Sequence, residues 1–287
     1  MGELDATYGA VLIGAFVCAV LFGVTNLQMF IYFQGYSSDG VWSKLTVCWL
    51  WLVDAIHLAF VIHMVYWYLV TNYFNPSALA VIVWTFKAQV MVNAIVVISV
   101  QSLYAMRVWQ LSVAFSMVDS RPPAFLKLLR VTVAAIVVLA YGVLIALCYE
   151  IVRFHEYSDF LAARYVTYFP LGVATGVDAI IASSLCYLLR RCRTGYSKMD
   201  STISVLMLFT VNTGILTILS SLTAMAMLAT LPDTFAAISV NLIVTHLYVN
   251  SFMAMFNARN SLRSDGFASE RTADLHLRSI GGSWQPT

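Results

Sequence analysis

Seven long apolar stretches constrain this sequence more than any other feature, because each can cross a membrane as a helix. A crossing helix needs about 20 apolar residues to span roughly 30 Å of hydrocarbon. Lipid offers no hydrogen-bond partners, so the backbone of such a segment must pair within itself. We therefore predict an all-α, polytopic membrane protein with a bundle of seven transmembrane helices. The predicted spans lie near residues 9–33, 46–70, 79–106, 128–149, 165–189, 202–229 and 235–257.

The composition supports the same class. Hydrophobic residues make up 61% of the 287 residues, and charged residues only 10%, whereas soluble domains carry about 25% charged residues. This excludes a soluble enzyme and a disordered chain. The net charge of +2 provides no basic surface for nucleic acid, so we expect the lipid bilayer and no nucleic acid among the partners.

The basic residues are distributed unevenly between the two sides of the predicted bundle. Of the 16 Lys and Arg residues, 13 fall in the loops and tail on one side. Only Arg153 and Arg164 lie on the other side, and Lys87 lies within a span. Because cytoplasmic loops are enriched in Lys and Arg, we predict that the N-terminus is outside and the C-terminus cytosolic. Residues 1–257 then form the transmembrane domain of a plasma-membrane or endomembrane protein, and residues 258–287 a polar cytosolic tail, predicted to be disordered.

Several ionisable residues lie inside the predicted spans, where a charge costs roughly 2.5–3.5 kcal/mol at the bilayer centre. Such residues usually face the interior of a bundle. Asp54 and His57 share one helix face because they are three residues apart. The candidate pocket residues are Asp54, His57, Lys87, Asp178 and His246.

Four uses of this polar layer remain open from the sequence. The side chains can form a packing network, or line a ligand pocket that opens outward between helices. They can also relay protons in a proton-coupled transporter. A metal site would use His57, His246 and Asp178 as ligands. We expect no cofactor, and treat the metal site as the alternative.

A second group of polar residues lies in the last two spans. Asn, Ser and Thr at such depth commonly form hydrogen bonds between helices, worth about 0.6 kcal/mol each. The candidates for this packing role are Asn212, Thr213, Asn241 and Asn250. Gly172 and Gly176 form a small-xxx-small pair, which predicts a close approach of the fifth span to a neighbour.

Several short motifs carry a resemblance to a known family. They are GVD at 176–178, YLL at 187–189, TGILT at 213–217, LYVNSFMAMFNAR at 247–259, WLVDAIH at 51–57 and YLVTNY at 68–73. With these motifs the chain resembles, over about residues 5–263, a family of fungal, basidiomycete-type integral membrane proteins catalogued only as a domain of unknown function. The resemblance implies seven helices with the N-terminus outside, and it implies no activity.

The leading functional hypothesis is a receptor-like protein that senses a small-molecule or lipid ligand through a polar pocket in mid-membrane. It rests on the topology and the polar layer, together with basic loops that suit an acidic cytosolic partner. The first alternative is a membrane-embedded, metal-dependent lipid hydrolase, although we favour a protein that is not an enzyme. The second alternative is a proton-coupled transporter.

Overall fold

The computed structural model describes residues 5–35, 39–73, 75–118, 124–157, 159, 163, 165–191, 197–231 and 234–281. Seven helices in these ranges are long and apolar enough to cross a membrane, which confirms the predicted number of helices and the class of multi-pass membrane protein. The elements are η1 (Asp5–Gly9), α1 (Ala10–Gly35), α2 (Val41–Tyr66), η2 (Trp67–Thr71), α3 (Pro76–Leu79), α4 (Trp84–Val118), α5 (Ala124–Arg153), α7 (Tyr165–Arg191), α8 (Ser197–Thr230) and α9 (Ala236–Gly281).

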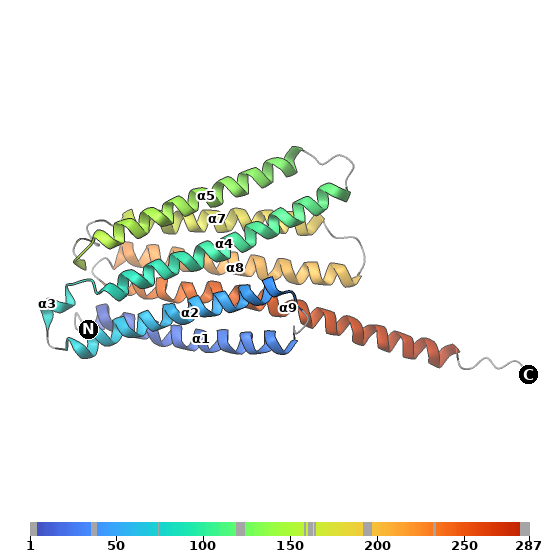
Figure 1. Cartoon of the computed structure of the whole chain (residues 1–287), viewed down its shortest axis with the longest axis horizontal. Coiled ribbons are helices and arrows are strands. Elements are labelled where there is room, and N and C mark those ends of the chain that lie inside the picture. Colours follow the sequence, from blue (N-terminus) through green and yellow to red (C-terminus); the bar gives the residue numbers. More distant parts are fainter. Residues whose placement is uncertain are drawn as a thin grey trace, which may run out of the picture.

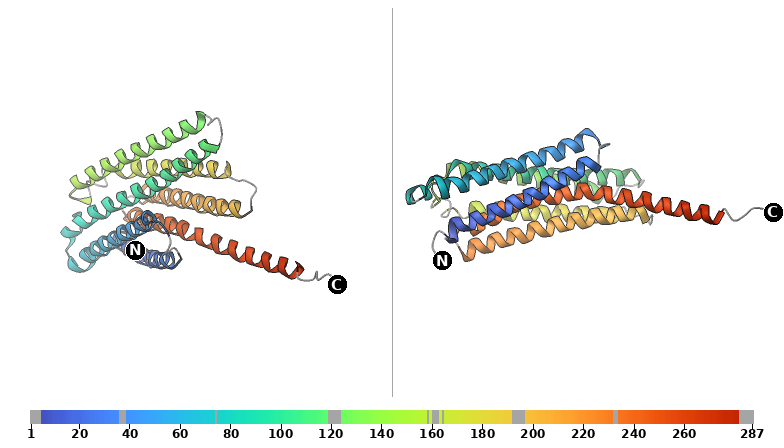
Figure 2. Two further views of the ribbon diagram at one scale, coloured as in Figure 1. Left: turned by 45° about the vertical axis from the view of Figure 1, so that its right-hand side comes forward. Right: turned by 90° about the horizontal axis from the view of Figure 1, so that it is seen from below.

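The long helices form one bundle in which neighbours in sequence are also neighbours in space (Figure 1). The ring closes because α9 packs along α1, so that the first and last spans lie side by side (Figure 2). Helix α4 occupies the central position, with contacts to α2, α5, α7 and α9. A side chain on α4 can therefore meet groups from either side of the bundle.

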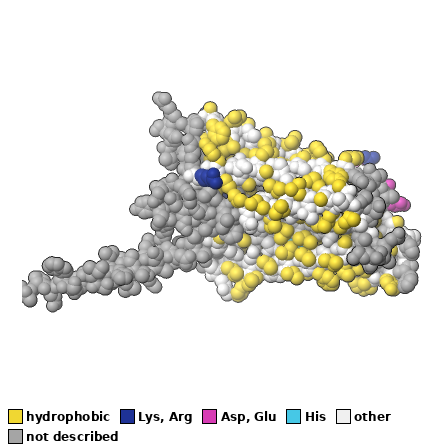
Figure 3. Space-filling model, turned by 180° about the vertical axis from the view of Figure 1, so that it is seen from behind, with side chains coloured by type: hydrophobic (Ala, Val, Ile, Leu, Met, Phe, Trp, Pro, Cys, Tyr) yellow, Lys and Arg dark blue, Asp and Glu magenta, His cyan; other side chains and the backbone are white. Residues whose placement is uncertain are grey.

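The outer surface of the bundle is apolar, as lipid requires. Large hydrophobic side chains such as Phe16, Val131 and Leu139 are more than half exposed. Figure 3 shows apolar side chains over much of one face, with the charged side chains near its ends. In water this much exposed apolar surface would drive association; in a bilayer it contacts acyl chains. The side of the membrane that each end faces stays a prediction.

An aromatic cluster closes the end of the bundle that carries α3. It consists of Tyr8, Tyr68, Phe86, Tyr157 and Phe235, and we call it the aromatic cap. The Tyr68 hydroxyl accepts from the Val83 backbone and donates to the Val81 carbonyl oxygen. Burial, followed by the neighbouring Tyr68, raises the pKa of Tyr157 well above its usual value. Through the hydrogen bonds of the Tyr68 hydroxyl, the aromatic cap thus attaches the α2–α4 loop to the core of the bundle.

Close helix packing occurs at a glycine other than the predicted pair. A Cβ added at Gly14 would lie 2.3 Å from Ser239 Oγ and 3.3 Å from Ser239 Cα, so α1 and α9 meet closely there. A Cβ at Gly172 or Gly176 would meet nothing within 4 Å. The prediction of a close approach at Gly172 and Gly176 is wrong, because both residues are on an exposed face of α7.

Helix α9 continues far beyond the predicted end of the last span at residue 257. Its backbone is helical without a break to Gly281. The candidate span on this helix nevertheless ends at Ala258, where the sequence turns polar. The prediction of a disordered tail over 258–287 stays a prediction, and residues 282–287 lie outside the described part of the chain.

Candidate functional site

A chain of buried polar side chains links α2, α4 and α9. His57 Nδ1 lies 3.3 Å from His246 Nε2, and His57 Nε2 lies 3.2 Å from Gln89 Oε1. His246 Nδ1 is 2.7 Å from Asp54 Oδ1, a charge contact without an aligned hydrogen bond. Asp54, His57 and His246 are fully buried, and Gln89 is 2% exposed. We call these four residues the histidine network.

Local helix geometry explains part of this arrangement. Asp54 and His57 lie on one face of α2 because residues three apart are neighbours on a helix. On α9, Asn250 lies one turn after His246, and its amide donates to the His246 carbonyl oxygen and to that of Leu21 in α1. Thr25 of α1 donates to Asp54 Oδ2 at 3.0 Å. The network is therefore anchored on four helices.

Counting protons shows what the histidine network can do chemically. Gln89 presents its carbonyl oxygen to His57, so His57 Nε2 donates in that contact. If His57 is neutral, its Nδ1 accepts and His246 Nε2 donates. A second proton on His246, beside Asp54, then makes an imidazolium–carboxylate pair with a total charge of zero, which suits a buried site. If the Gln89 amide were flipped, its NH2 group would donate to His57, and His57 Nε2 would then be the acceptor.

Asp178 belongs to a different cluster, in which its partners are neutral. Gln101 of α4 donates to Asp178 Oδ1 at 3.1 Å, and the Tyr248 hydroxyl of α9 donates to Oδ2. Nearby, the Tyr104 hydroxyl donates to Thr213 Oγ1 at 3.4 Å. Asp178, Tyr248, Tyr104 and Thr213 line a small cavity between α4, α7, α8 and α9, and Gln101 lies outside its lining. The structure does not bring Asp178 to the two imidazoles.

A larger cavity of about 110 Å³ lies between α4, α5, α7, α8 and α9. It extends from Phe86 and Phe235 of the aromatic cap to Val97 and Tyr248 deeper in the bundle. One water needs roughly 10–15 Å³ of such space, so the cavity has room for a larger guest. We call it the main cavity because it lies among five helices; a second pocket, between α4 and α5, has the larger volume of about 330 Å³.

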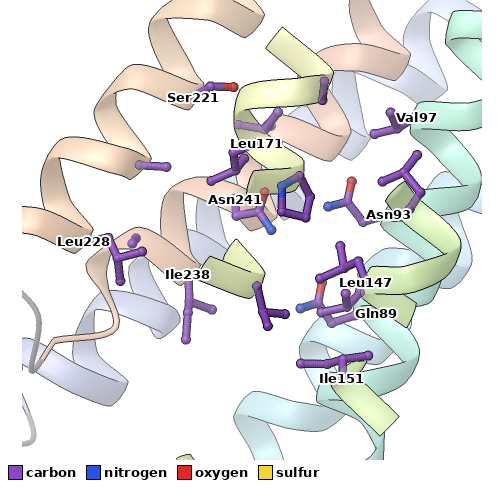
Figure 4. A pocket seen from close by; sticks show the side chains of 18 of the residues that line it. Gln89, Asn93, Val97, Leu147, Ile151, Leu171, Ser221, Leu228, Ile238 and Asn241 are labelled. Carbon is purple, nitrogen blue, oxygen red and sulfur yellow. The ribbon is translucent and has the colours of Figure 1, made fainter. Parts of the chain in front are cut away.

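The walls of the main cavity are mostly apolar, with a few amides. Asn93 and Asn241 project into it from α4 and α9, and Gln89 reaches it near Leu147 and Ile151 (Figure 4). The Oδ1 atom of Asn93 is buried and has no hydrogen-bond partner. Gln89 is shared: it lines the cavity and contacts His57. Tyr248 is shared in the same way, since it lines the cavity and donates to Asp178.

The residues predicted from the sequence as pocket or packing candidates lie at different places relative to the main cavity. None of the five candidate pocket residues lines the main cavity; three of them lie behind Gln89 in the histidine network. Lys87 donates to the Val152 carbonyl oxygen at 3.0 Å. Of the packing candidates, Thr213 and Asn250 are buried, Asn241 lines the main cavity, and Asn212 is on an exposed face of α8.

The metal alternative needs three ligands in one place. Within the described residues, no group of three His, Cys, Asp or Glu side chains is arranged to hold a metal ion. The two imidazoles approach each other, but the second nitrogen of each is already engaged, with Gln89 and Asp54.

Gln89 and Asn93 are not ionisable, so a prediction based on charged and titratable side chains does not include them. A signal was present: Gln89, Asn93 and Gln101 are spaced by multiples of four along α4, which places them on one slowly winding stripe of the helix. The stripe meets His57, the main cavity and Asp178 in turn. Polar residues at helical spacing on the central helix were the usable clue.

Comparison with known proteins gives one match. Residues 174–261 match the model of a family described as a family of unknown function, DUF6534. The matched segment covers most of α7, all of α8 and the first half of α9. It includes Asp178, His246 and Tyr248, and excludes Asp54, His57 and Gln89. No curated protein and no solved structure matches the chain.

Proposed function

We propose that this chain is a receptor-like membrane protein that binds a small-molecule or lipid ligand in the main cavity. The observation that carries the proposal is the double role of Gln89, which lines the cavity and contacts His57 Nε2. Ligand pockets are typically apolar with a few placed polar groups, as in the main cavity. Three amides thus project into a mostly apolar pocket, and His57 lies one contact behind Gln89.

Gln89 gives ligand binding a route to the rest of the bundle. A ligand that takes the Gln89 carbonyl oxygen competes with His57 Nε2 for the same acceptor. Because His57 contacts His246 and His246 lies beside Asp54, a change in the protons of His57 alters what His246 must donate or accept and therefore its charge contact with Asp54. Asp54 accepts a hydrogen bond from Thr25 of α1. Ligand binding in the cavity would therefore change the contact between α1 and α2, on the opposite side of the bundle.

The predicted orientation places the output on the cytosolic side. Near the inner end of α4, Arg107 lies over the Phe252 and Phe256 rings of α9, with the centroids 5.6 and 5.2 Å from its guanidinium carbon. Helix α4 carries Gln89 and α9 carries His246, so two of the helices that carry the network meet at this contact. We propose that an acidic cytosolic partner binds the basic loops, and that its affinity depends on the relative position of α4 and α9.

Ligand-dependent stability of the purified full-length chain in lipid nanodiscs tests the binding proposal. A panel of lipids and small amphiphiles is added, and the unfolding temperature is recorded. A ligand at 100 times its Kd stabilises by about 2.7 kcal/mol. Ala224→Phe fills the main cavity, because Ala224 is a buried lining residue, and should abolish the response.

Ala226→Phe is the matched control, since Ala226 is on the exposed face of the same helix and should leave the response intact. A flat response across the panel, or equal responses in the wild type and Ala224→Phe, would overturn the proposal. The coupling step has its own readout: ligand addition should change the carboxyl infrared band assigned with Asp54→Asn. That change should vanish in Gln89→Leu, and its persistence there would remove Gln89 from the route.

Proton-coupled transport is the second candidate, and we propose it on a separate observation. Thr25, Asp54, His246, His57 and Gln89 form a continuous chain of contacts of 3.3 Å or less, and buried His and Asp chains relay protons in transporters. Proton uptake into reconstituted vesicles under an imposed potential should then be lost in Asp54→Asn. Vesicles with no flux above empty liposomes would reject this candidate.

A further inference from the structure

We infer that the main cavity takes an uncharged amphiphile, with an apolar chain and one head group that both donates and accepts hydrogen bonds, such as a primary alcohol or a carboxamide. The inference rests on the proposed function and specifies its ligand class. It follows from the charges, the polar groups and the walls of the cavity, taken in turn.

The lining carries no formal charge. Among the described residues that line the main cavity there is no Asp, Glu, Lys, Arg or His. The buried carboxylates behind it are already engaged: Asp54 pairs with His246, and Asp178 accepts from Gln101 and Tyr248. A charged ligand would therefore bring an unpaired charge out of water, at a cost of several kcal/mol. An uncharged ligand avoids this cost.

The polar groups of the lining require a partner with both hydrogen-bonding roles. Asn93 Oδ1 is buried without a partner, and an unsatisfied buried acceptor costs about 1–3 kcal/mol. Each carboxamide also carries two N–H donors. Figure 4 shows the Asn93 and Asn241 side chains projecting toward the same space from α4 and α9. A hydroxyl or carboxamide placed between them can donate to Asn93 and accept from Asn241.

The rest of the wall suits a hydrocarbon chain. Five helices supply apolar side chains to it, among them Val90, Leu144, Leu171, Ala224 and Ile238. Burying each methylene group against such a wall contributes about 0.8 kcal/mol. A polar guest without a chain would leave these contacts unmade, so the head group needs an apolar body.

The test uses four ten-carbon probes that differ in the head group: 1-decanol, decanamide, decanoate and decyltrimethylammonium. Each is titrated into the full-length chain in nanodiscs, and the unfolding temperature is followed for the wild type and Ala224→Phe. We expect 1-decanol and decanamide to stabilise the wild type only, and the two charged probes to give no difference between the proteins. Subtracting the Ala224→Phe response removes effects of probe dissolved in the lipid.

Asn93→Leu should weaken the apparent affinity for 1-decanol at least tenfold. The same substitution at the exposed Asn212 is the matched control and should change nothing. If Asn93→Leu does not fold, Asn241→Leu replaces it, with the same expected loss. An unchanged affinity in the folded variant would overturn the role of the amides.

The outcomes separate the ligand class from the proposed function. If decanoate or the ammonium probe stabilises the wild type as strongly as 1-decanol, and Ala224→Phe removes the effect, the ligand class is wrong and the binding site stands. If neither these probes nor the broader lipid panel distinguishes the wild type from Ala224→Phe, both the ligand class and the proposed function fall.

Discussion

The two sides of the bundle treat buried polar groups in opposite ways. Toward α1 and α2, Asp54, His57 and His246 contact one another directly and leave no exposed surface. Toward α5, α7 and α8, the amides of Asn93 and Asn241 face an open cavity. The first side thus buries its polar side chains in contact with one another, whereas the second side leaves a cavity with room for a ligand.

A tight helix contact lies on the network side. Gly14 packs against Ser239 where α1 meets α9, whereas Gly172 is on an exposed face of α7 and a Cβ there would meet nothing within 4 Å. Tight packing and polar pairing thus occur together on the network side. Four substitutions can break or sharpen this distinction, and they follow in order of expected effect.

Asp54→Leu should destabilise the protein by about 3 kcal/mol, because it leaves the His246 imidazole buried without its carboxylate. Unfolding in SDS measures the free energy. Replacing both residues by Leu should cost less than the sum of the two single changes. A loss of about 0.6 kcal/mol, the average for a hydrogen bond between membrane helices, would show that Asp54 and His246 form no charged pair.

Gly14→Ala should destabilise by about 2 kcal/mol, since overpacking a tight contact costs roughly 1–3 kcal/mol and Ser239 must move. The same change at Gly172 should be neutral or should stabilise by about 0.5 kcal/mol, as Ala is the better helix former. Comparing the two unfolding free energies tests whether α1 and α9 pack closely at Gly14. Equal effects would contradict a tight contact there.

Tyr248→Phe should cost about 1.5 kcal/mol, because the Asp178 carboxylate loses a donor and hydrogen bonds to charged groups are worth about 1.5–3 kcal/mol. Gln101 still donates to Asp178, which keeps the loss at the low end. Tyr66→Phe, at an exposed position of α2, is the control for the substitution itself. No loss in Tyr248→Phe would mean that Asp178 does not depend on Tyr248.

Tyr157→Phe should lower stability slightly at every pH, because the hydrogen bond from Tyr157 to the Tyr68 hydroxyl is lost, and should flatten the alkaline part of the stability profile. The pKa of Tyr157 is raised in the folded state, so its contribution is complete below about pH 10, the unfolded value. Above that pH the contribution is lost at about 1.4 kcal/mol per pH unit. Stability measured between pH 8 and 10.5 should fall less steeply in the variant, and identical slopes would contradict the burial of this phenol.

The spans were predictable because each depends on its own residues, and one boundary difference has a cause elsewhere in the chain. The third long helix, α4, begins at Trp84 rather than near residue 79. The preceding residues form α3 and a short pairing with the α5–α7 loop, in which the Ile82 amide donates to the His155 carbonyl oxygen and the Tyr157 amide to that of Ala80. Hydropathy cannot detect such a pairing between distant loops.

The sequence by itself indicated seven helices long and apolar enough to cross a bilayer, and it placed Asp54 and His57 on one face. These features follow from hydropathy and the helical period within one segment. Only the tertiary structure decided that Asp54 pairs with His246 rather than with Lys87 or Asp178, and that a few amides project into a mostly apolar cavity. The physical reason is that pairing and empty volume depend on how helices far apart in the chain pack together; His57 and His246, for example, are 189 residues apart.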